Sequence, residues 1–456
     1  MRGVDKRFGL WTAVSMVVGI VIGSGVFFKA PKVLTASGGS VSVALAAWVI
    51  GAISMIFGAL VFADCASKVE KANGLVDYAE AFVSEKFSVL VGWFFAVLYY
   101  PALAAVLAWV AGLYTSILVG NKSILWPAAV LYALLAAALN YFSPVLSARF
   151  QVSTTIIKLV PLVLISVVGI ALGVYSGTTF ENFSVAATMI DESTQGFSKA
   201  VLATAFAYEG WVVAVSINNE IKDSEKNLRK ALVFGALFIF AIYVTYFLGI
   251  VGILPVAEVL SNGEGAVAEA ASVVFGPLGS SILTAFVVVS CLGTLNGLTI
   301  GASRGFFGLA VRGYGPRPEQ FAKVDERTQI SNSSARLSFV LIGLYLLVWY
   351  GNFEGWFGTF VDISELPIAL MYALYMVIYV QYMVKSTEET VVKRFVIPVI
   401  ALLGGAIVVF GGLTKASVIL DLSISIAVFA SGLLFTTKRS TNNESQTVPE
   451  LKLSRN

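Results

Sequence analysis

The sequence predicts an all-α polytopic membrane protein with twelve transmembrane helices. Its 456 residues are 58% hydrophobic and only 12% charged, which is more apolar surface than a soluble core could bury. The apolar residues are grouped in segments of about 20 residues or more, the length that crosses a bilayer as a helix. Lysine and arginine concentrate in alternate loops between these segments, as they do in polytopic membrane proteins.

Each segment in turn is apolar and bounded by polar or charged residues. The twelve segments are residues 9–34, 41–66, 87–119, 124–142, 147–175, 197–217, 230–253, 278–307, 336–351, 358–384, 393–413 and 417–437. Residues 1–437 therefore form a single transmembrane domain, and the polar tail 438–456 is predicted to be disordered. Between the spans we expect a short amphipathic helix at the cytoplasmic interface within 68–86, a polar external segment at 176–196 and a helical cap at 255–277.

The positive charges indicate the orientation. If the N-terminus is cytoplasmic, 24 of the 30 lysines and arginines lie in cytoplasmic loops or tails, and five lie outside. The five are Lys29, Lys32, Lys122, Lys199 and Lys415. One missed span would scatter the later charges to the wrong side, so the pattern predicts two cytoplasmic termini and leaves Lys158 as the single cation within the membrane.

Several classes of function are excluded by what the sequence lacks. It contains no histidine, which removes histidine proton relays, the usual zinc sites and serine-histidine hydrolases. It has no phosphate-binding Gly-x-x-x-x-Gly-Lys-Ser/Thr motif, and its two cysteines, Cys65 and Cys291, fall within predicted helices. We therefore predict no enzyme, no cofactor, no metal, no disulfide and, at a net charge of +3, no nucleic-acid partner.

Three glycines interrupt the first span, in Gly-Ile-Val-Ile-Gly-Ser-Gly-Val-Phe at residues 19–27. Backbone that leaves the helix at membrane depth persists only where it is buried in protein or lines a polar cavity. Gly23 and Gly25 permit unwound geometry, and the Ser24 hydroxyl beside freed amides could hold a carboxylate. Taken alone, the motif is equally compatible with a glycine-rich helix-packing face.

A second interruption lies in the sixth span, in Ala-Phe-Ala-Tyr-Glu-Gly-Trp at residues 205–211. Interrupted spans at matching places in two halves of a chain indicate an inverted-repeat transporter with its site between the repeats. The half-helix N-termini would face a substrate carboxylate and the free carbonyls its ammonium group. An α-amino acid carries both charges.

These motifs resemble the amino acid-polyamine-organocation superfamily, and in particular its L-type amino acid transporter branch with the related bacterial alanine-serine-cysteine and serine/threonine exchangers. Further matching residues are Asn219-Glu220, Lys226-Asn227-Leu228, and Cys291-Leu-Gly-Thr-Leu-Asn-Gly followed by Ser303-Arg304. The resemblance implies a LeuT-type fold with broken helices 1 and 6. Its inverted repeats would span about 9–175 and 197–384, with two accessory helices at about 393–437. It also implies sodium-independent amino acid exchange by alternating access.

The resemblance also implies the positions of the substrate. The α-carboxylate would lie against Gly23, Ser24 and Gly25, and the α-amino group against carbonyls near Ile20, Val21 and Phe206. The Phe206 ring would close over the substrate from outside. The implied substrate-binding set is Ile20, Val21, Gly23, Ser24, Gly25, Phe206, Ala207 and Glu209.

Two departures from the family pattern bear on substrate and partner. Glu209 stands where members for large neutral substrates have glycine, which favours small substrates such as alanine, serine, cysteine and threonine. The loop at about 119–123 has no cysteine, whereas animal members form a disulfide there to a single-span glycoprotein. We therefore expect a stand-alone prokaryotic transporter in the cell membrane, without a disulfide-linked heavy chain.

Lys158, in Ile-Ile-Lys-Leu-Val-Pro, matches the family's lysine on helix 5. In the functional interpretation its ammonium stands where sodium-coupled relatives bind an ion, and donates to carbonyls at the first break and to Thr294. In the alternative it only ties helices together. A sodium- or proton-coupled symporter of the same fold is the alternative function. Other acids near helix ends, namely Asp64, Asp362, Glu365 and Asp421, are expected to be solvated or in structural ion pairs.

Overall fold

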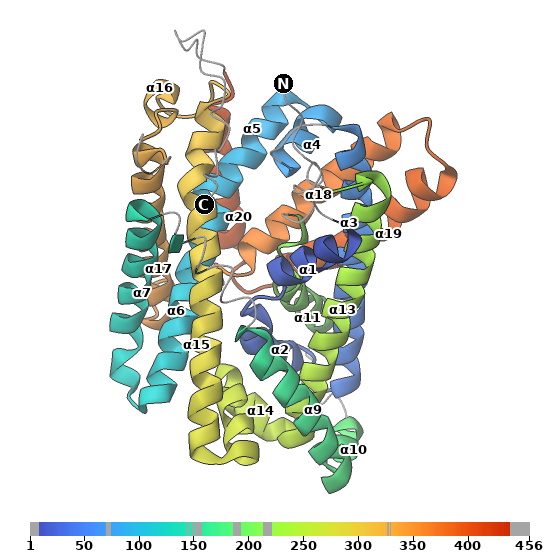
Figure 1. Cartoon of the computed structure of the whole chain (residues 1–456), viewed down its shortest axis with the longest axis vertical. Helices are drawn as coiled ribbons and strands as arrows, with labels where there is room; N and C mark the ends of the chain where they lie inside the picture. Colours follow the sequence, from blue (N-terminus) through green and yellow to red (C-terminus); the bar gives the residue numbers. More distant parts are fainter. Residues whose placement is uncertain are drawn as a thin grey trace.

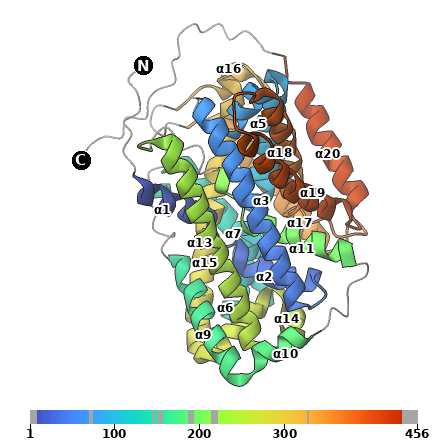
Figure 2. The ribbon, with the colours of Figure 1, turned by 90° about the vertical axis from the view of Figure 1, so that its right-hand side faces the viewer.

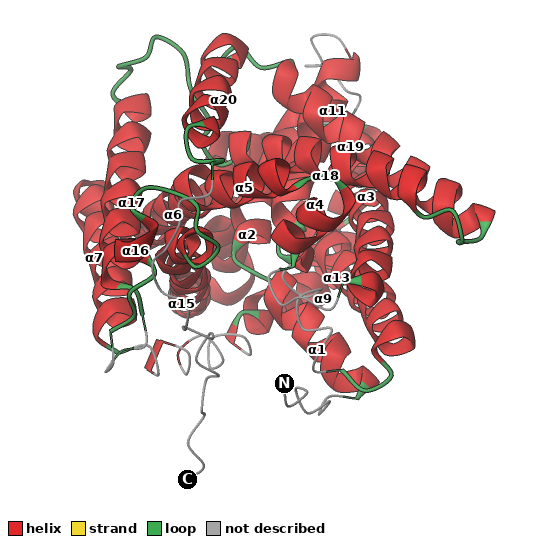
Figure 3. Cartoon of the chain, turned by 90° about the horizontal axis from the view of Figure 1, so that it is seen from above, coloured by secondary structure: helices red, strands yellow, loops and turns green. Residues whose placement is uncertain are grey.

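The computed structural model describes residues 9–69, 74–143, 146–147, 150, 157–185, 193–212, 221–325, 328 and 330–437. Every regular element in these ranges is helical, as the view in Figure 3 shows. The predicted tail 438–456 and the Asn219-Glu220 motif lie outside the described residues.

Residues 9–185 supply eleven of the described elements. They are α1 (Leu10–Val21), α2 (Gly25–Ala36), α3 (Val41–Lys68), α4 (Leu75–Phe82), α5 (Glu85–Phe94), the π-helical η1 (Phe95–Tyr99), α6 (Tyr100–Val119), η2 (Lys122–Ile124), α7 (Leu125–Phe142), α9 (Leu159–Ser176) and α10 (Thr178–Ser184).

Residues 193–437 supply the other eleven elements, which again are long helices joined by short ones. Its elements are α11 (Ser193–Ala207), α13 (Ser224–Ile253), α14 (Val256–Asn262), η4 (Gly263–Gly265), α15 (Ala266–Ala310), α16 (Pro318–Phe321), α17 (Asn332–Phe353), α18 (Leu366–Lys385), the π-helical η5 (Val392–Val396), α19 (Ile397–Leu413) and α20 (Val418–Leu433).

Nine stretches of helix among the described residues are long and apolar enough to cross a membrane, and three shorter apolar helices accompany them. The short ones are Leu10–Gly19, Gly196–Ala207 and Val418–Leu433. Each of the twelve predicted spans contains one of these helices, so the predicted class of all-α polytopic membrane protein is confirmed. The number of crossings and the division into two inverted repeats remain predictions.

The helices form two groups (Figures 1 and 2). On the left of Figure 1, α6, α7, α15 and α17 pack against one another. On the right, α13 packs against α1, α3 and α9, while α11 packs against α2, α3 and α19. The short α1, α2 and α11 lie toward the middle of Figure 1, so the two interrupted spans are placed between the groups.

The two ends of the bundle carry different short helices. In Figure 1, α4 and α16 lie at the upper end and α10 and α14 at the lower end. These ends are named the α4 end and the α14 end below. The predicted cap at 255–277 is confirmed as helical, because it consists of α14, η4 and the first turns of α15, up to a kink at Gly276.

The predicted amphipathic helix is α4, but it does not lie on a lipid surface. Its apolar side chains are buried in the protein, with Tyr78 stacked on Phe62 and Phe82 packed against Tyr382. Asp77 on the same helix is buried and forms an ion pair with Arg312. The predicted helix is therefore present, and its apolar face packs on protein, since amphipathicity does not distinguish a lipid surface from a protein surface.

The expected polar segment at 176–196 contains a helix that the sequence analysis missed, α10. Asn182 attaches it to the end of α13, since its side-chain amide donates to the carbonyls of Val251 at 2.6 Å and Leu254 at 2.9 Å. The side-chain oxygen of Asn182 in turn accepts from the amide of Val256 at 3.0 Å. A seven-residue helix held by one asparagine leaves little periodicity in the sequence.

Glycines bring α9 and α13 into backbone contact. A Cβ added at Gly169 would lie 2.3 Å from the carbonyl oxygen of Gly249, and one added at Gly249 would lie 2.3 Å from that of Ile165. Helices approach this closely only where small residues face each other, the usual basis of helix association in membranes.

We expect Gly249→Leu to destabilise the protein by about 1–3 kcal/mol or more, because the added side chain cannot fit without separating α9 from α13. The matched control is Gly343→Leu on α17, where an added Cβ meets no atom within 4 Å. Thermal unfolding in detergent measures both. Equal unfolding temperatures for the two variants would contradict the assigned packing.

Candidate functional site

The first span is interrupted where predicted, between the end of α1 at Val21 and the start of α2 at Gly25. Ile22 is extended, with ψ at 95°. Neither Gly23 nor Gly25 has a positive φ, so the unwound backbone here does not use the left-handed conformations that only glycine adopts readily. Glycine is needed at position 25 for space, because an added Cβ would lie 3.2 Å from the Phe206 ring and 3.3 Å from the Cα of Ala207.

Two side chains hold the backbone of this break. The amide of Ser24 donates to Thr294 Oγ1 on α15 at 3.3 Å, and the hydroxyl of Tyr243 on α13 donates to the carbonyl of Val21 at 3.2 Å. The Ser24 hydroxyl itself is buried and makes no hydrogen bond of good geometry to any described residue, although the Cys291 thiol lies close by. Because buried polar groups are normally paired, this hydroxyl is available to a ligand.

The sixth span is also interrupted as predicted. Helix α11 ends at Ala207, and residues 208–210 form a turn in which Gly210 has φ at 109°, a conformation that favours glycine. The carbonyl of Phe206 accepts from the amide of Glu209 at 3.2 Å. A carbonyl has two lone pairs, so the oxygen can still accept from a ligand ammonium.

Aromatic side chains connect the two breaks. Tyr208 stacks on Tyr243 with ring centroids 5.4 Å apart, and its hydroxyl donates to the carbonyl of Trp48 at 3.2 Å. Tyr243, which also holds Val21, was not predicted. The amino-acid sequence contains no signal for this role, because Tyr243 is one of 17 tyrosines and lies at a regular position on an apolar helix.

A cavity of about 1000 Å³ lies at the two breaks. It brings together nine of the ten predicted residues, namely Val21, Gly23, Ser24, Gly25, Lys158, Phe206, Ala207, Glu209 and Thr294. The tenth, Ile20, belongs to α1, but its side chain is outside the described part of the structure. From the breaks the cavity extends toward the α4 end, where Gly74, Arg304 and Arg312 line it.

Glu209 forms part of the wall of this cavity. Neither carboxylate oxygen makes a hydrogen bond of good geometry to any described residue, although the Tyr99 hydroxyl lies close by. Tyr99 and Tyr100 line the same wall from η1 and α6. Phe94, in the same aromatic run, is buried in helix packing instead.

Lys158 lines the cavity and is 2% exposed. It stands directly before α9, which begins at Leu159, and residues 151–156 lie outside the described residues, so its predicted depth along a continuous helix is not tested. Its charge lies within electrostatic range of Cys291, one helical turn before Thr294 on α15. Donation from Lys158 to the break carbonyls and to Thr294 stays a prediction.

A second lysine, Lys29, is buried as well, which contradicts the prediction that Lys158 is the single buried lysine. It was assigned to the outside, but it is 1% exposed on α2. Its Nζ lies 4.7 Å from the centroid of the Phe206 ring, donates to Ser364 at 2.9 Å and pairs with Glu365 Oε1 at 3.2 Å. The ammonium is buried because these partners replace its hydration.

A second cavity, of about 700 Å³, lies beyond Lys29 and is lined by Lys122 and Glu264 near the α14 end. Phe206 lines the first cavity and Lys29 the second. The ring and the ammonium on it therefore stand between the two cavities.

The four acids near helix ends were predicted to be either solvated or in structural ion pairs. Three of them are in ion pairs. Asp362 pairs with Lys32, Glu365 with three lysines, and Asp64 with Arg229. Asp421 accepts from Ser417 at 3.0 Å. In the described ranges, no three histidine, cysteine, aspartate or glutamate side chains form a group that could hold a metal ion.

A helical membrane bundle with a cavity at two interrupted helices is the architecture of a secondary transporter. The chain belongs to the amino acid permease family, whose model matches residues 8–442. It is 29% identical to the serine/threonine exchanger SteT of Bacillus subtilis over 95% of this chain and 96% of that protein.

Two human proteins are also similar. The large neutral amino acids transporter small subunit 2 is 29% identical over 77% of this chain and 67% of its own length. The cystine/glutamate transporter is 26% identical over 72% of this chain and 65% of its own length. These comparisons confirm the resemblance, and the relatives are transporters rather than enzymes.

We expect Gly25→Val to abolish substrate binding while the protein remains folded, because its side chain would collide with Phe206 and Ala207 where a carboxylate is predicted. Gly25→Ala should weaken binding about tenfold, which corresponds to about 1.4 kcal/mol. The control is Gly343→Ala on α17, where an added Cβ meets no atom within 4 Å. Stabilisation against heat by L-serine measures binding, and undiminished stabilisation of Gly25→Val would place the site elsewhere.

Proposed function

We propose that the chain is a sodium-independent exchanger of small neutral L-amino acids, such as alanine, serine, cysteine and threonine, that works by alternating access. The observation that carries this proposal is the cavity that joins both helix breaks to Lys158 and Glu209. Similarity to a serine/threonine exchanger over nearly the full length of both chains supports it.

The polar groups at the breaks fit the two charges of an amino acid. The free Ser24 hydroxyl and the amide of Gly25 at the start of α2 would receive the carboxylate, at the positive end of a helix. The carbonyls of Val21 and Phe206 each have one partner in the structure and one lone pair left for the ammonium group.

The side chain of the substrate would point toward Glu209 and the tyrosines. Glu209 and Tyr99 in the cavity wall would then limit the space beyond the substrate Cβ and make that part of the wall polar. A hydroxyl or thiol on a short side chain can be accommodated there, whereas a large apolar side chain would leave a buried carboxylate without water.

The orientation follows from the charge distribution, with the α4 end and both termini cytoplasmic in the cell membrane. On this assignment the large cavity opens to the cytoplasm, and Phe206 with Lys29 closes the external path. The turn after α6, at Gly120 to Ser123, has no cysteine for a heavy chain, and we propose a transporter that acts without one.

Lys158 would account for the absence of sodium coupling. Its ammonium is a fixed cation beside the cavity, and a tethered cation cannot dissociate in each cycle as a bound ion does. Transport would then run as exchange, in which substrate itself is needed to return the carrier.

The direct test is counterflow in proteoliposomes against all twenty amino acids, with and without sodium and pH gradients. Exchange of alanine and serine that depends on internal amino acid and not on either gradient would support the proposal. Uptake that requires a sodium or proton gradient would instead indicate a symporter of the same fold.

We expect Glu209→Gly to widen the substrate range, because it removes the carboxylate and the volume that limit large side chains. The ratio of leucine to alanine exchange should rise about tenfold, within the range that such pocket changes produce. Competition of unlabelled amino acids with labelled alanine measures it. Exchange of phenylalanine as fast as alanine by the unmodified protein would contradict the size argument.

We expect Lys158→Ala to lower exchange about tenfold or more and to weaken substrate affinity on at least one face of the membrane, while expression and monodispersity stay nearly normal. The physical reason is the loss of a buried cation next to the unwound segment. Substitution of Lys122, an exposed lysine in η2, by alanine is the control. Normal exchange by Lys158→Ala would refute the coupling role.

A further inference from the structure

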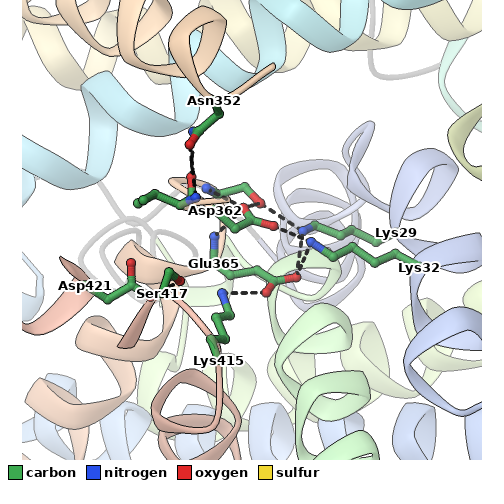
Figure 4. A network of polar contacts seen from close by, with 10 residues as sticks. Lys29, Lys32, Asn352, Asp362, Glu365, Lys415, Ser417 and Asp421 are labelled. Atoms are coloured by element: carbon green, nitrogen blue, oxygen red, sulfur yellow. Dashed lines mark hydrogen bonds and ion pairs between the residues drawn. The ribbon is translucent and has the colours of Figure 1, made fainter. Parts of the chain in front are cut away.

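An ionic cluster surrounds Glu365 (Figure 4). Its Lys29 stands over the Phe206 ring and lines the second cavity, which is called the outer cavity here, while the larger one is called the inner cavity. Its carboxylates belong to Asp362 and Glu365, in the loop before α18, and both residues are buried. Its ammonium groups belong to Lys29, Lys32 and Lys415, which reach the carboxylates from two different directions.

The carboxylates are held in a fixed position from α17. The amide of Asn352 donates to the carbonyl of Val361 at 2.8 Å, and its oxygen accepts from the Val361 amide at 3.0 Å. One residue later, Asp362 Oδ1 accepts from the amide of Ser364 at 2.9 Å. The acidic loop is therefore anchored to α17 through Asn352 and leads directly into α18, whose N-cap residue is Glu365.

The lysines of α2 approach one oxygen of Glu365. Oε1 is 3.2 Å from Lys29 Nζ and 2.7 Å from Lys32 Nζ, and Lys32 also pairs with Asp362. Helix α2 directly follows the break at residues 22–24, so these pairs connect the second half of the first span to the acidic loop.

The other oxygen of Glu365 faces the accessory helices. Oε2 is 2.7 Å from Nζ of Lys415, in the turn between α19 and α20, where the lysine side chain is 12% exposed. Asp421 on α20 lies within electrostatic range of Lys415, so three ammonium groups and three carboxylates are balanced in this region.

We propose that Lys415 is a positioning residue of the external closure, which is formed by Phe206, Lys29 and the ionic cluster. Lys415 holds one carboxylate oxygen of Glu365 so that the opposite oxygen contacts Lys29 and Lys32. The α19–α20 pair thereby becomes part of this closure, or gate. This inference rests on the proposed alternating-access function. Opening toward the α14 end requires α2 to leave Glu365. Without Lys415 no ion pair holds Oε2 toward the turn between α19 and α20, so the geometry that aims Oε1 at Lys29 and Lys32 in the closed state is lost.

The experiment measures opening by the reactivity of a cysteine with a membrane-impermeant maleimide added outside intact cells. Leu107→Cys is the reporter, because Leu107 on α6 lines the inner cavity, beyond the closure from outside. Ile117→Cys on the same helix lines the second cavity, is exposed, and reports accessibility in either state. The two native cysteines are buried, so the parent without a reporter serves as the blank.

We expect Lys415→Met to raise the labelling rate of the Leu107→Cys reporter roughly fivefold or more, since the closed state loses a buried ion pair. Lys415→Arg should restore the parent rate. Lys122→Met removes a lysine from the wall of the same outer cavity and should leave the rate unchanged. The Ile117→Cys rate should stay constant in all of these variants, which also tests the assumed orientation.

The variant Glu365→Gln tests whether Lys415 acts by positioning Glu365. If Lys415 acts through Glu365, the double variant Lys415→Met/Glu365→Gln should label no faster than Glu365→Gln alone. Parent-like labelling of Lys415→Met, or additive effects in the double variant, would overturn the proposal. If Lys415→Met does not reach the membrane, Lys415→Gln is used in the same comparisons.

The labelling assay does not depend on transport, so the two proposals fail separately. Faster labelling of Lys415→Met together with no amino acid exchange by the parent would leave the closure intact and refute the proposed function. Normal exchange with unchanged labelling would refute only the closure.

Discussion

The structure depends on one constraint: backbone that leaves a helix inside a membrane bundle must find its hydrogen bonds within the protein. At the first break, Tyr243 of α13 supplies the donor for the Val21 carbonyl and Thr294 of α15 supplies the acceptor for the Ser24 amide. These two helices belong to different groups of the bundle. The break is therefore held from both sides, and a relative displacement of the groups must change its geometry.

Buried charge imposes the second constraint. A lysine in the interior is stable only when acceptors replace its water, and breaking such an arrangement is far more costly than breaking a surface pair. Lys29 meets this requirement with a carboxylate, a hydroxyl and an aromatic face, all of which come from residues outside α2. Movement of α2 away from these partners is favourable only if water enters at the same time. Closure and dehydration of the external path are consequently one event.

The sequence was sufficient for features that depend on local patterns. The apolar segments predicted the helices, and the glycines near residues 23 and 210 predicted both interruptions, because glycine in the middle of an apolar span weakens the helix at that point. The predicted site residues also came together around one cavity.

Features that depend on distant partners were missed. Lys29 lies near the end of an apolar segment, and its burial follows from residues 335 and 336 positions away in the chain. The role of Tyr243 likewise depends on a carbonyl 222 positions earlier, and α4 could be assigned to protein rather than lipid only once Phe62 and Tyr382 were in place.

Phe206 joins these constraints. One part of its ring lies against the position of a Cβ at Gly25, where the substrate carboxylate is proposed to bind, and Lys29 stands over the ring. The ring cannot move away from the first break without disturbing the ammonium that holds Glu365. A ligand that displaces the ring therefore acts on the external closure through direct contact, and no longer pathway is needed to connect the binding site with the gate.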